Sequence, residues 1–214
     1  MVPINPNEDL ENNHVLFIGK SGSGKTFAIK NHPLIKKRGA RVVVWDPYES
    51  HDCHYSKTVA NFGRSLSSAI KSKKGFKIGL AVNPTVEAFE RFCRMVWIAA
   101  DGSKKLIVVV EELGDVAATG KASPHWGKMV RVGRKYGVIL FPATQRPNEV
   151  DKTVFTQVSR VWVGLVSNYD HAYVERSTGI PKGGLSKIEA NSYHYYFVYG
   201  NDIKYGTPSK KVKM

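Results

Sequence analysis

A glycine-rich segment of eight residues, GKSGSGKT at positions 19–26, constrains the fold of this 214-residue chain more than any other feature. It matches the pattern GxxxxGK[ST], with the apolar run HVLFI before it and a segment of helical composition, KTFAIKN, overlapping its end. A strand that leads through such a loop into a helix binds phosphate, because glycine lets backbone N–H groups surround the anion and the helix N-terminus adds positive potential. The segment predicts a nucleotide-phosphate site formed by Gly19, Lys20, Ser21, Gly22, Ser23, Gly24, Lys25 and Thr26.

Two side chains at the end of this loop have separate expected roles. Lys25 is placed to reach the β and γ phosphates of ATP, and the Thr26 hydroxyl is placed on Mg²⁺, which takes oxygen ligands and bridges the same phosphates. The sequence thus predicts ATP and Mg²⁺ as cofactors. A glycine-rich turn that matches the pattern by chance is the alternative, and the flanking strand and helix disfavour it.

Apolar runs rich in β-branched residues recur along the chain between helix-like segments. This alternation is typical of βαβ units around a buried parallel sheet, so the fold class we predict is α/β, a central and mostly parallel β-sheet flanked by helices in three layers. Expected strands are residues 14–18, 41–46, 76–82, 106–112, 137–144 and 160–166, with a less regular edge strand or hairpin at 193–199.

Helical periodicity is clearest at residues 85–99, where one face carries Val86, Phe89, Phe92, Cys93, Val96 and Trp97. Other expected helices are residues 25–31, 59–72, 124–136 and 169–178. We expect a single domain over residues 1–214, because this length supports one core. Its expected parts are an N-terminal arm (1–13), a core (14–166) and a C-terminal extension of helix and edge strand (167–214).

The strand LIVVVEE ends in two adjacent carboxylates, Glu111 and Glu112. An enzyme with a phosphate-binding loop of this kind needs an acid at a neighbouring strand end for the metal's water shell, and often a second one to orient the attacking water. We assign the metal role to Glu111, where Asp is usual, and the catalytic role to Glu112. The extra methylene of Glu111 leaves the division of roles between the two open. A buried strand that ends in solvated acids is the alternative.

The next apolar strand ends in Thr144 and Gln145. Ligands of open α/β sheets bind at the carboxyl ends of strands, and an amide both donates and accepts hydrogen bonds. We therefore expect Gln145 to sense the γ-phosphate or the attacking water.

The chain is strongly basic, with 32 Lys and Arg against 18 Asp and Glu and a formal charge of +14. Such a field attracts polyanions, which makes nucleic acid the first expected partner and an anionic membrane surface the second; a basic surface kept for solubility is the alternative. The two cysteines, Cys53 and Cys93, are far apart and suggest no disulfide framework. We expect no signal peptide and no transmembrane segment.

Four motifs together carry a family resemblance: GKSGSGKT, LIVVVEE, RKYGV at 134–138 and ATQRP at 143–147. In this order and spacing they resemble the FtsK/HerA group of P-loop ATPases that pump DNA, over roughly residues 14–166. The resemblance implies a P-loop NTPase fold of the RecA/FtsK-like kind, a sensor role for Gln145, and an arginine finger that reaches the neighbouring subunit's nucleotide. Arg134 takes the finger position, and Arg131 is the second candidate. For each arginine, a surface position or an ion pair is the alternative.

The small size of the chain is similar to that of the genome-packaging ATPases of tailless, membrane-containing double-stranded DNA viruses. The resemblance therefore implies a homo-oligomeric ring that acts on double-stranded DNA, with capsid or vertex proteins as further partners, at the packaging vertex of the virion and in the host cytoplasm. For the DNA path, the basic candidates are Lys71, Lys73, Lys74 and Lys121, with Lys77 beside them. A solvated face is an equal alternative for each lysine.

Two other signals favour a structural interpretation. Residues 48–54 (YESHDCH) gather residue types that bind zinc, but no second cluster completes a site, so we interpret them as a polar loop after the strand RVVVWD. Asp46, at the carboxyl end of that strand, is a candidate for a place near the nucleotide or its adenine, and a place in the loop away from the nucleotide is an equal alternative. The aromatic run at 193–197 favours edge-strand packing over base stacking. A small-molecule kinase and a nucleotide-gated assembly factor remain as alternative functions.

Overall fold

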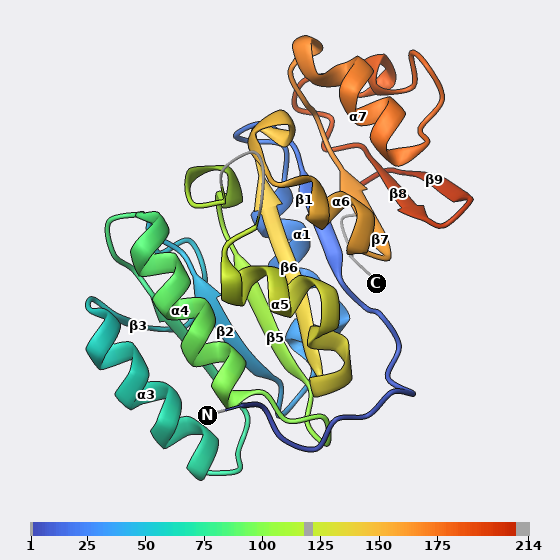
Figure 1. Ribbon diagram of the computed structural model, residues 1–214. Helices are drawn as coiled ribbons and strands as arrows, with labels where there is room; N and C mark the ends of the chain where they lie inside the picture. Colours follow the sequence, from blue (N-terminus) through green and yellow to red (C-terminus); the bar gives the residue numbers. More distant parts are fainter. Residues whose placement is uncertain (1, 118–121, 209–214) are drawn as a thin grey trace.

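The computed structural model describes residues 2–117 and 122–208, and one nine-stranded sheet runs through it in the order β3-β4-β2-β5-β6-β1-β7-β8-β9 (Figure 1). The pairs from β3 to β7 are parallel, and the pairs β7–β8 and β8–β9 are antiparallel. The strands are β1 (Val15–Ile18), β2 (Arg41–Trp45), β3 (His54–Ser56), β4 (Phe76–Leu80), β5 (Leu106–Val110), β6 (Val138–Thr144), β7 (Arg160–Val163), β8 (Tyr195–Tyr199) and β9 (Asp202–Gly206).

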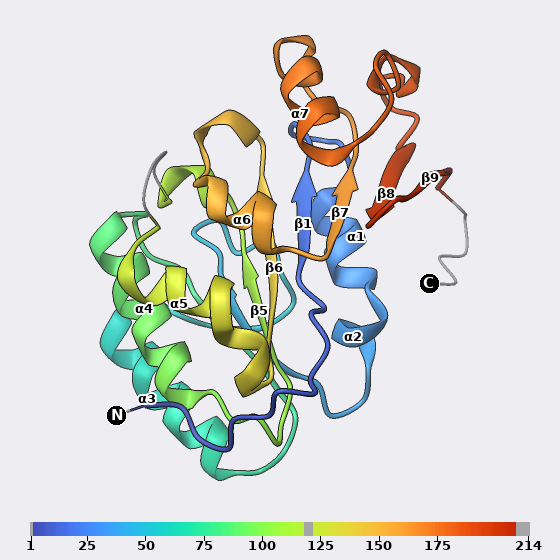
Figure 2. The ribbon, with the colours of Figure 1, turned by 45° about the vertical axis from the view of Figure 1, so that its right-hand side comes forward.

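Helices cover both faces of the sheet. Figures 1 and 2 show α3, α4, α5 and α6 on one face and α1 and α2 on the other, while α7 lies beside the C-terminal hairpin. The helices are α1 (Lys25–Asn31), α2 (Pro33–Lys36), α3 (Val59–Lys71), α4 (Val86–Ala99), α5 (Pro124–Val132), α6 (Lys152–Gln157) and α7 (His171–Thr178), with short 3-10 helices at η1 (Leu113–Asp115), η2 (Gly133–Tyr136), η3 (Pro147–Glu149), η4 (Asn168–Asp170) and η5 (Leu185–Lys187).

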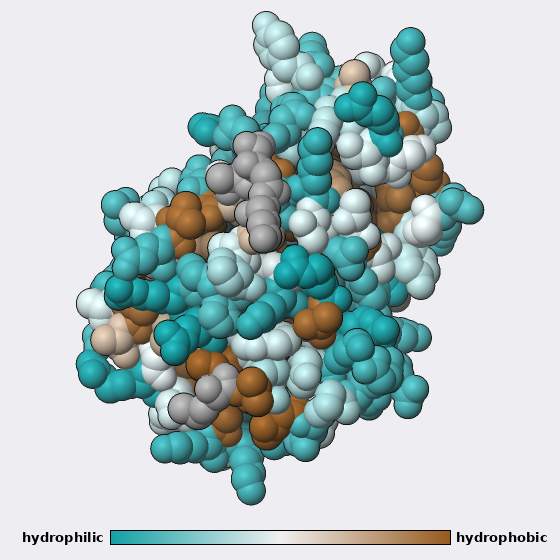
Figure 3. All heavy atoms as spheres, viewed as in Figure 1, coloured by the Kyte–Doolittle hydropathy of each residue, from teal (hydrophilic) through white to brown (hydrophobic). Residues whose placement is uncertain are grey.

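The central strands are buried on both faces, and their side chains alternate between two apolar clusters. In β2, Val43 and Trp45 pack with α3 and α4, whereas Val42 and Val44 pack with Ile29 of α1 on the opposite side. All five residues of β5 are buried. This is why the central strands appear in the sequence as continuous apolar runs and not as alternating ones. On the molecular face in Figure 3, hydrophilic side chains predominate and apolar ones form small separate patches.

The predicted elements are confirmed, with differences at their ends. The helix expected at 124–136 is α-helical only to Val132 and then tightens into η2. The less regular run at 193–199 contains β8, which forms a hairpin with the unpredicted β9 and extends the sheet beyond β7. Within the part of the chain that the structure describes, no helix has both the length and the apolar character needed to cross a membrane.

The N-terminal arm crosses the amino edge of the sheet, where the parallel strands begin (Figure 1). Ile4 N–H donates to the carbonyl of Ala100 at 3.2 Å, and Asn7 N–H donates to that of Lys135 at 2.7 Å. Directly after the arm, His14 is 1% exposed, and its Nδ1 accepts a hydrogen bond of 3.1 Å from Leu140 N–H. Burial, with a smaller contribution from Arg134, lowers the pKa of His14 to about 4.

We predict that acidification destabilises the fold through His14. Between about pH 6.5 and pH 4 the unfolded chain binds a proton that folded His14 does not, so the free energy of unfolding falls as pH falls, by up to about 1.4 kcal/mol per pH unit. His14→Asn keeps an acceptor for Leu140 N–H and cannot titrate, so urea denaturation should show a shallower pH dependence for the variant. Equal slopes for the two proteins would contradict this prediction.

Candidate active site

The predicted P-loop lies at the carboxyl edge of the sheet and borders a cavity of about 640 Å³. The parallel strands β1, β5 and β6 all end at this edge, and they bring the glycine-rich loop, the two glutamates and the amide together. The cavity is lined by residues of four segments and a tyrosine from the C-terminal extension: Ser21 to Phe27, Tyr48 and Ser50, Glu111 to Asp115 without Leu113, Thr144 to Arg146, and Tyr193.

Glycines of the loop have conformations that other residues adopt only at a cost. Gly22 and Gly24 have φ angles of 75° and 93°, and Gly24 is the N-cap of α1. Gly19 lies against Ser23, and a Cβ on Gly19 would collide with the Ser23 side chain. The hydroxyl of Ser23 is buried and has no hydrogen-bond partner among the described residues. A loop of this shape, with an unpaired hydroxyl and the free N–H groups of a helix N-terminus, fits a phosphate.

Lys25 is buried at the start of α1, with 6% of its surface exposed. Its Nζ donates to the carbonyl oxygens of Gly19, at 2.6 Å, and Lys20, at 3.3 Å. Burial lowers the pKa of Lys25, and Glu112 and Glu111 act in the opposite direction. The ammonium is therefore held against the carbonyls of the loop, close enough to the two carboxylates to interact with their charges.

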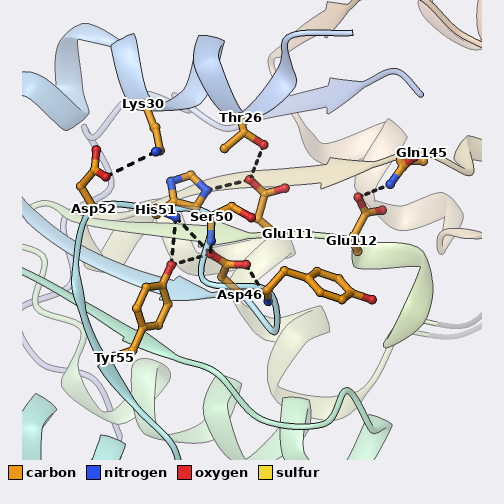
Figure 4. A network of polar contacts seen from close by, with 11 residues as sticks. Thr26, Lys30, Asp46, Ser50, His51, Asp52, Tyr55, Glu111, Glu112 and Gln145 are labelled. Carbon is orange, nitrogen blue, oxygen red and sulfur yellow. Dashed lines mark hydrogen bonds and ion pairs between the residues drawn. The ribbon is translucent and has the colours of Figure 1, made fainter. Parts of the chain in front are cut away.

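Glu111, directly after β5, contacts two side chains (Figure 4). Its Oε1 accepts a hydrogen bond of 3.2 Å from the Thr26 hydroxyl and lies 2.7 Å from His51 Nε2 in a second hydrogen bond. Mg²⁺ at such sites binds through one or two protein oxygens, waters and phosphates. The adjacent hydroxyl and carboxylate of Thr26 and Glu111 therefore fit Mg²⁺.

Glu112 and Gln145, which also line the cavity, point toward each other (Figure 4). Gln145 Nε2 donates to Glu112 Oε1 at 2.5 Å. The contact exists because β6 is inserted between the P-loop strand β1 and the acidic strand β5, so the residue after β6 lies between the two motifs. Glu112 itself has a φ of 48°, a left-handed conformation that is uncommon for a residue with a side chain and occurs often at functional sites.

A loop that the sequence assigned no catalytic role completes the site. Asp46, at the end of β2, is fully buried and its carboxylate accepts hydrogen bonds from the backbone N–H groups of Tyr48, Ser50 and His51, at 3.1, 2.5 and 3.2 Å. The Tyr55 hydroxyl donates to the same carboxylate, and burial and this bond raise the pKa of Tyr55. Asp46 therefore organises the loop, and it is not among the residues that line the cavity.

His51 is the main residue of the site that sequence reasoning missed. It belongs to the segment 48–54, whose metal-binding residue types attracted notice, but its partner Glu111 is 60 positions away and only the fold joins them. Within the described part of the chain no group of three or more His, Cys, Asp or Glu side chains could hold a metal ion. The loop positions of Tyr48 and Tyr193 at the cavity were also not predicted.

The remaining predicted residues lie elsewhere. Arg134 is in η2 at the amino edge, where its guanidinium donates to the carbonyls of Glu8, at 2.9 Å, and Leu10, at 2.6 Å. The second finger candidate, Arg131, is exposed at the end of α5. Lys71, Lys73 and Lys74 are exposed at the amino edge as well. Lys121 lies outside the described residues.

The comparison with curated proteins identifies the chain's relatives. Protein P9 of the Pseudoalteromonas phage PM2 is 41% identical to this chain over an alignment of 162 residues, and the match covers 74% of this chain and 71% of P9. The chain belongs to the P9 family. No protein-family model matches the sequence.

Solved structures show which fold this P9-family chain has. The genome packaging NTPase B204 of Sulfolobus turreted icosahedral virus 2, in complex with AMPPCP, has a TM-score of 0.72 at 16% identity and covers 92% of this chain and 98% of its own. The DNA-packaging ATPase B204 of Sulfolobus turreted icosahedral virus has a TM-score of 0.68 at 18% identity, and the match covers 96% of this chain and 99% of B204. VirB4 of Thermoanaerobacter pseudethanolicus has a TM-score of 0.61 at 10% identity, and the match covers 99% of this chain and 96% of VirB4. The predicted α/β fold of P-loop NTPases, with its central and mostly parallel sheet, is therefore confirmed.

We predict that the P9-family chain depends on Asp46 for the shape of this site. Asp46→Ala should lower the free energy of unfolding by about 2–4 kcal/mol, because several donors lose their acceptor at once. Urea denaturation measures the change. Asp52→Ala is the matched control in the same loop, since 91% of that side chain is exposed, and it should change the free energy by less than about 0.5 kcal/mol. Equal effects for the two variants would contradict the prediction.

Proposed function

We propose that this protein is an ATPase that translocates double-stranded DNA as a homo-oligomeric ring and packages a viral genome. The observation that carries the proposal is the contact between Glu112 and Gln145 beside the P-loop, because a carboxylate and an amide in this place can orient a water and detect the γ-phosphate together. A phosphate-binding loop alone would suit any nucleotide-binding protein.

The side chains of the cavity divide the chemistry of ATP hydrolysis among them. Lys25 and the loop N–H groups hold the β and γ phosphates, and Glu112 orients the attacking water for in-line displacement. Thr26 and Glu111 would hold Mg²⁺. When bound, the ion would neutralise negative charge on the phosphates. Gln145 hydrogen-bonds Glu112 in this structure, so loss of the γ-phosphate can be transmitted through this pair to β6.

The choice of a packaging motor rests on the relatives. The chain is in the family of a phage protein, and the solved structures with the same fold include enzymes described as a genome packaging NTPase and a DNA-packaging ATPase. The formal charge of +14 favours binding to a polyanion such as double-stranded DNA. Capsid or vertex proteins complete the proposed set of partners, and the packaging vertex and host cytoplasm are the proposed places of action.

Ring formation is supported by the position of Arg134. It lies at the amino edge, whereas the P-loop lies at the carboxyl edge of the same sheet, so Arg134 would serve the nucleotide of a neighbouring subunit and not its own. A guanidinium fork stabilises charge on a transferring phosphoryl group, and delivery from a neighbour makes hydrolysis depend on assembly. Arg134 would exchange the carbonyls of Glu8 and Leu10 for phosphate oxygens.

We predict that Glu112→Gln abolishes turnover and leaves nucleotide binding intact. The amide keeps the shape of the side chain but loses the charge that orients and activates water, so kcat should fall by about 10²–10⁴-fold. Steady-state phosphate release measures turnover, and a fluorescent ATP analogue measures binding. Loss of packaging in the same variant would support a motor, while retained packaging would indicate an ATP-gated assembly factor.

We predict that duplex DNA raises the ATPase rate of the wild-type protein. A rate that duplex DNA leaves unchanged, together with phosphate transfer to a nucleoside, would identify a small-molecule kinase and contradict the motor.

We predict that Arg134→Ala stops hydrolysis in uniform rings and that activity returns in rings mixed with Lys25→Ala subunits. In a mixed ring an intact P-loop can face an intact Arg134 of its neighbour, although neither variant is active alone. Phosphate release across a series of mixing ratios measures the rescue. If the mixtures hydrolyse no more ATP than the two variants do separately, Arg134 does not act across an interface.

A further inference from the structure

Two basic connections meet at the amino edge of the sheet, at the end farthest from the nucleotide cavity. The first leads from α2 into β2 and the second from α3 into β4. Together with the last residues of α2 and α3 they carry six exposed cations, which we call the basic edge: Lys36, Lys37, Arg38, Lys71, Lys73 and Lys74.

The fold, and not the sequence order, brings these cations together. Strands β2 and β4 are neighbours in register, with Arg41 opposite Phe76, so both connections end at the same place. α2 and α3 lie on opposite faces of the sheet, and their connections close over its end from both sides (Figure 2). The basic edge therefore spans the thickness of the sheet.

Backbone contacts fix the two connections against each other. Phe76 N–H donates to the carbonyl of Ala40 at 2.9 Å. Gly75 lies so close to Gly39 that a Cβ on Gly75 would be 2.5 Å from the Gly39 Cα, which only a glycine permits. The Arg41 guanidinium lies 5.6 Å from the centre of the Phe76 ring and donates to the carbonyl of Lys104. The connection from α4 to β5, which contains Lys104, is thus held at the same edge. The cations thus extend from an ordered base.

The six cations are not paired with carboxylates in the part of the chain that the structure describes. None of them forms an ion pair with a residue that the structure describes. The carboxylate of this edge, Asp101, accepts hydrogen bonds from Asn5 and Ser103, and Glu8 of the N-terminal arm pairs with Lys135. Six uncompensated charges in one place lower stability by mutual repulsion and favour a polyanion.

We propose that the basic edge binds the phosphate backbone of duplex DNA, at a site separate from the nucleotide cavity. This inference rests on the proposed function for the identity of the polyanion. Duplex DNA carries one charge per about 1.7 Å of axis, so a stretch of about 10 Å presents about six phosphate charges, roughly one for each cation of the edge.

The composition of the edge selects backbone contacts over base contacts. Lysine is a compact point charge on a flexible stem, and it binds phosphate without the planar recognition that bases require. Among the described residues, no largely exposed aromatic side chain belongs to either connection, so a stacking platform for single-stranded bases is missing there. The edge therefore binds duplex without sequence preference, as a translocating motor requires.

The test compares three triple-alanine variants of the full chain in their affinity for a fluorescent duplex of about 30 base pairs of mixed sequence across a salt series, with an ATP analogue and Mg²⁺ present. The first variant replaces Lys71, Lys73 and Lys74, and the second replaces Lys36, Lys37 and Arg38. The matched control removes the same charge from exposed lysines away from the edge, Lys152, Lys182 and Lys187. Thermal unfolding confirms that each variant is folded.

The salt slope is the steepness with which the logarithm of the binding constant falls against the logarithm of the salt concentration. Each edge variant should reduce this steepness by about 2–3, since every phosphate that a cation no longer neutralises removes about 0.9. The control should leave the slope within about 0.5 of the wild type. Replacing Lys71, Lys73 and Lys74 by arginine keeps the charges and should keep the slope.

Three results would overturn the inference. Edge variants that bind duplex with the wild-type slope would show that the DNA lies elsewhere, with the motor function intact. Loss of the oligomer in light scattering, with an unchanged slope, would make the edge a subunit interface. A wild-type protein that binds no duplex at all would instead contradict the proposed function itself.

Discussion

The functional arrangement depends on one constraint of parallel sheets, which is that all strands end at the same edge. β1, β5 and β6 deliver the P-loop, Glu111 with Glu112, and Gln145 to that edge, although these motifs are spread over more than a hundred residues. The insertion of β6 between β1 and β5 is what places Gln145 within hydrogen-bond distance of Glu112. The same constraint collects the connections at the amino edge, where Arg134 and the basic edge lie.

The site is held by charged groups whose hydrogen bonds are satisfied inside the protein. Asp46 accepts hydrogen bonds from the loop after β2 and so holds His51 of that loop in place. His51 in turn hydrogen-bonds Glu111, whose carboxylate also accepts a hydrogen bond from Thr26. Lys25 is buried near Glu112 and Glu111, and burial lowers its pKa. Buried polar groups of this kind are costly unless they are paired, so the network preserves the shape of the cavity.

The sequence was sufficient for the elements whose signal is local. β5 and β6 are buried on both faces and appear as apolar runs, and the P-loop has a pattern that implies its own geometry. The edge strands β3 and β9, at the two ends of the sheet, were missed because β3 has only three residues and β9 has no buried residue. The contact of His51 with Glu111 and the meeting of the basic connections depend on strand order, which no local pattern contains.

Electron microscopy of the protein with a non-hydrolysable ATP analogue and duplex DNA tests the proposed motor most directly. The proposal predicts a closed ring with duplex in its channel and the analogue's γ-phosphate between Lys25 and the pair of Glu112 and Gln145, facing Arg134 of the next subunit. Monomers that bind the analogue without assembling, or a ring that excludes the duplex, would contradict it.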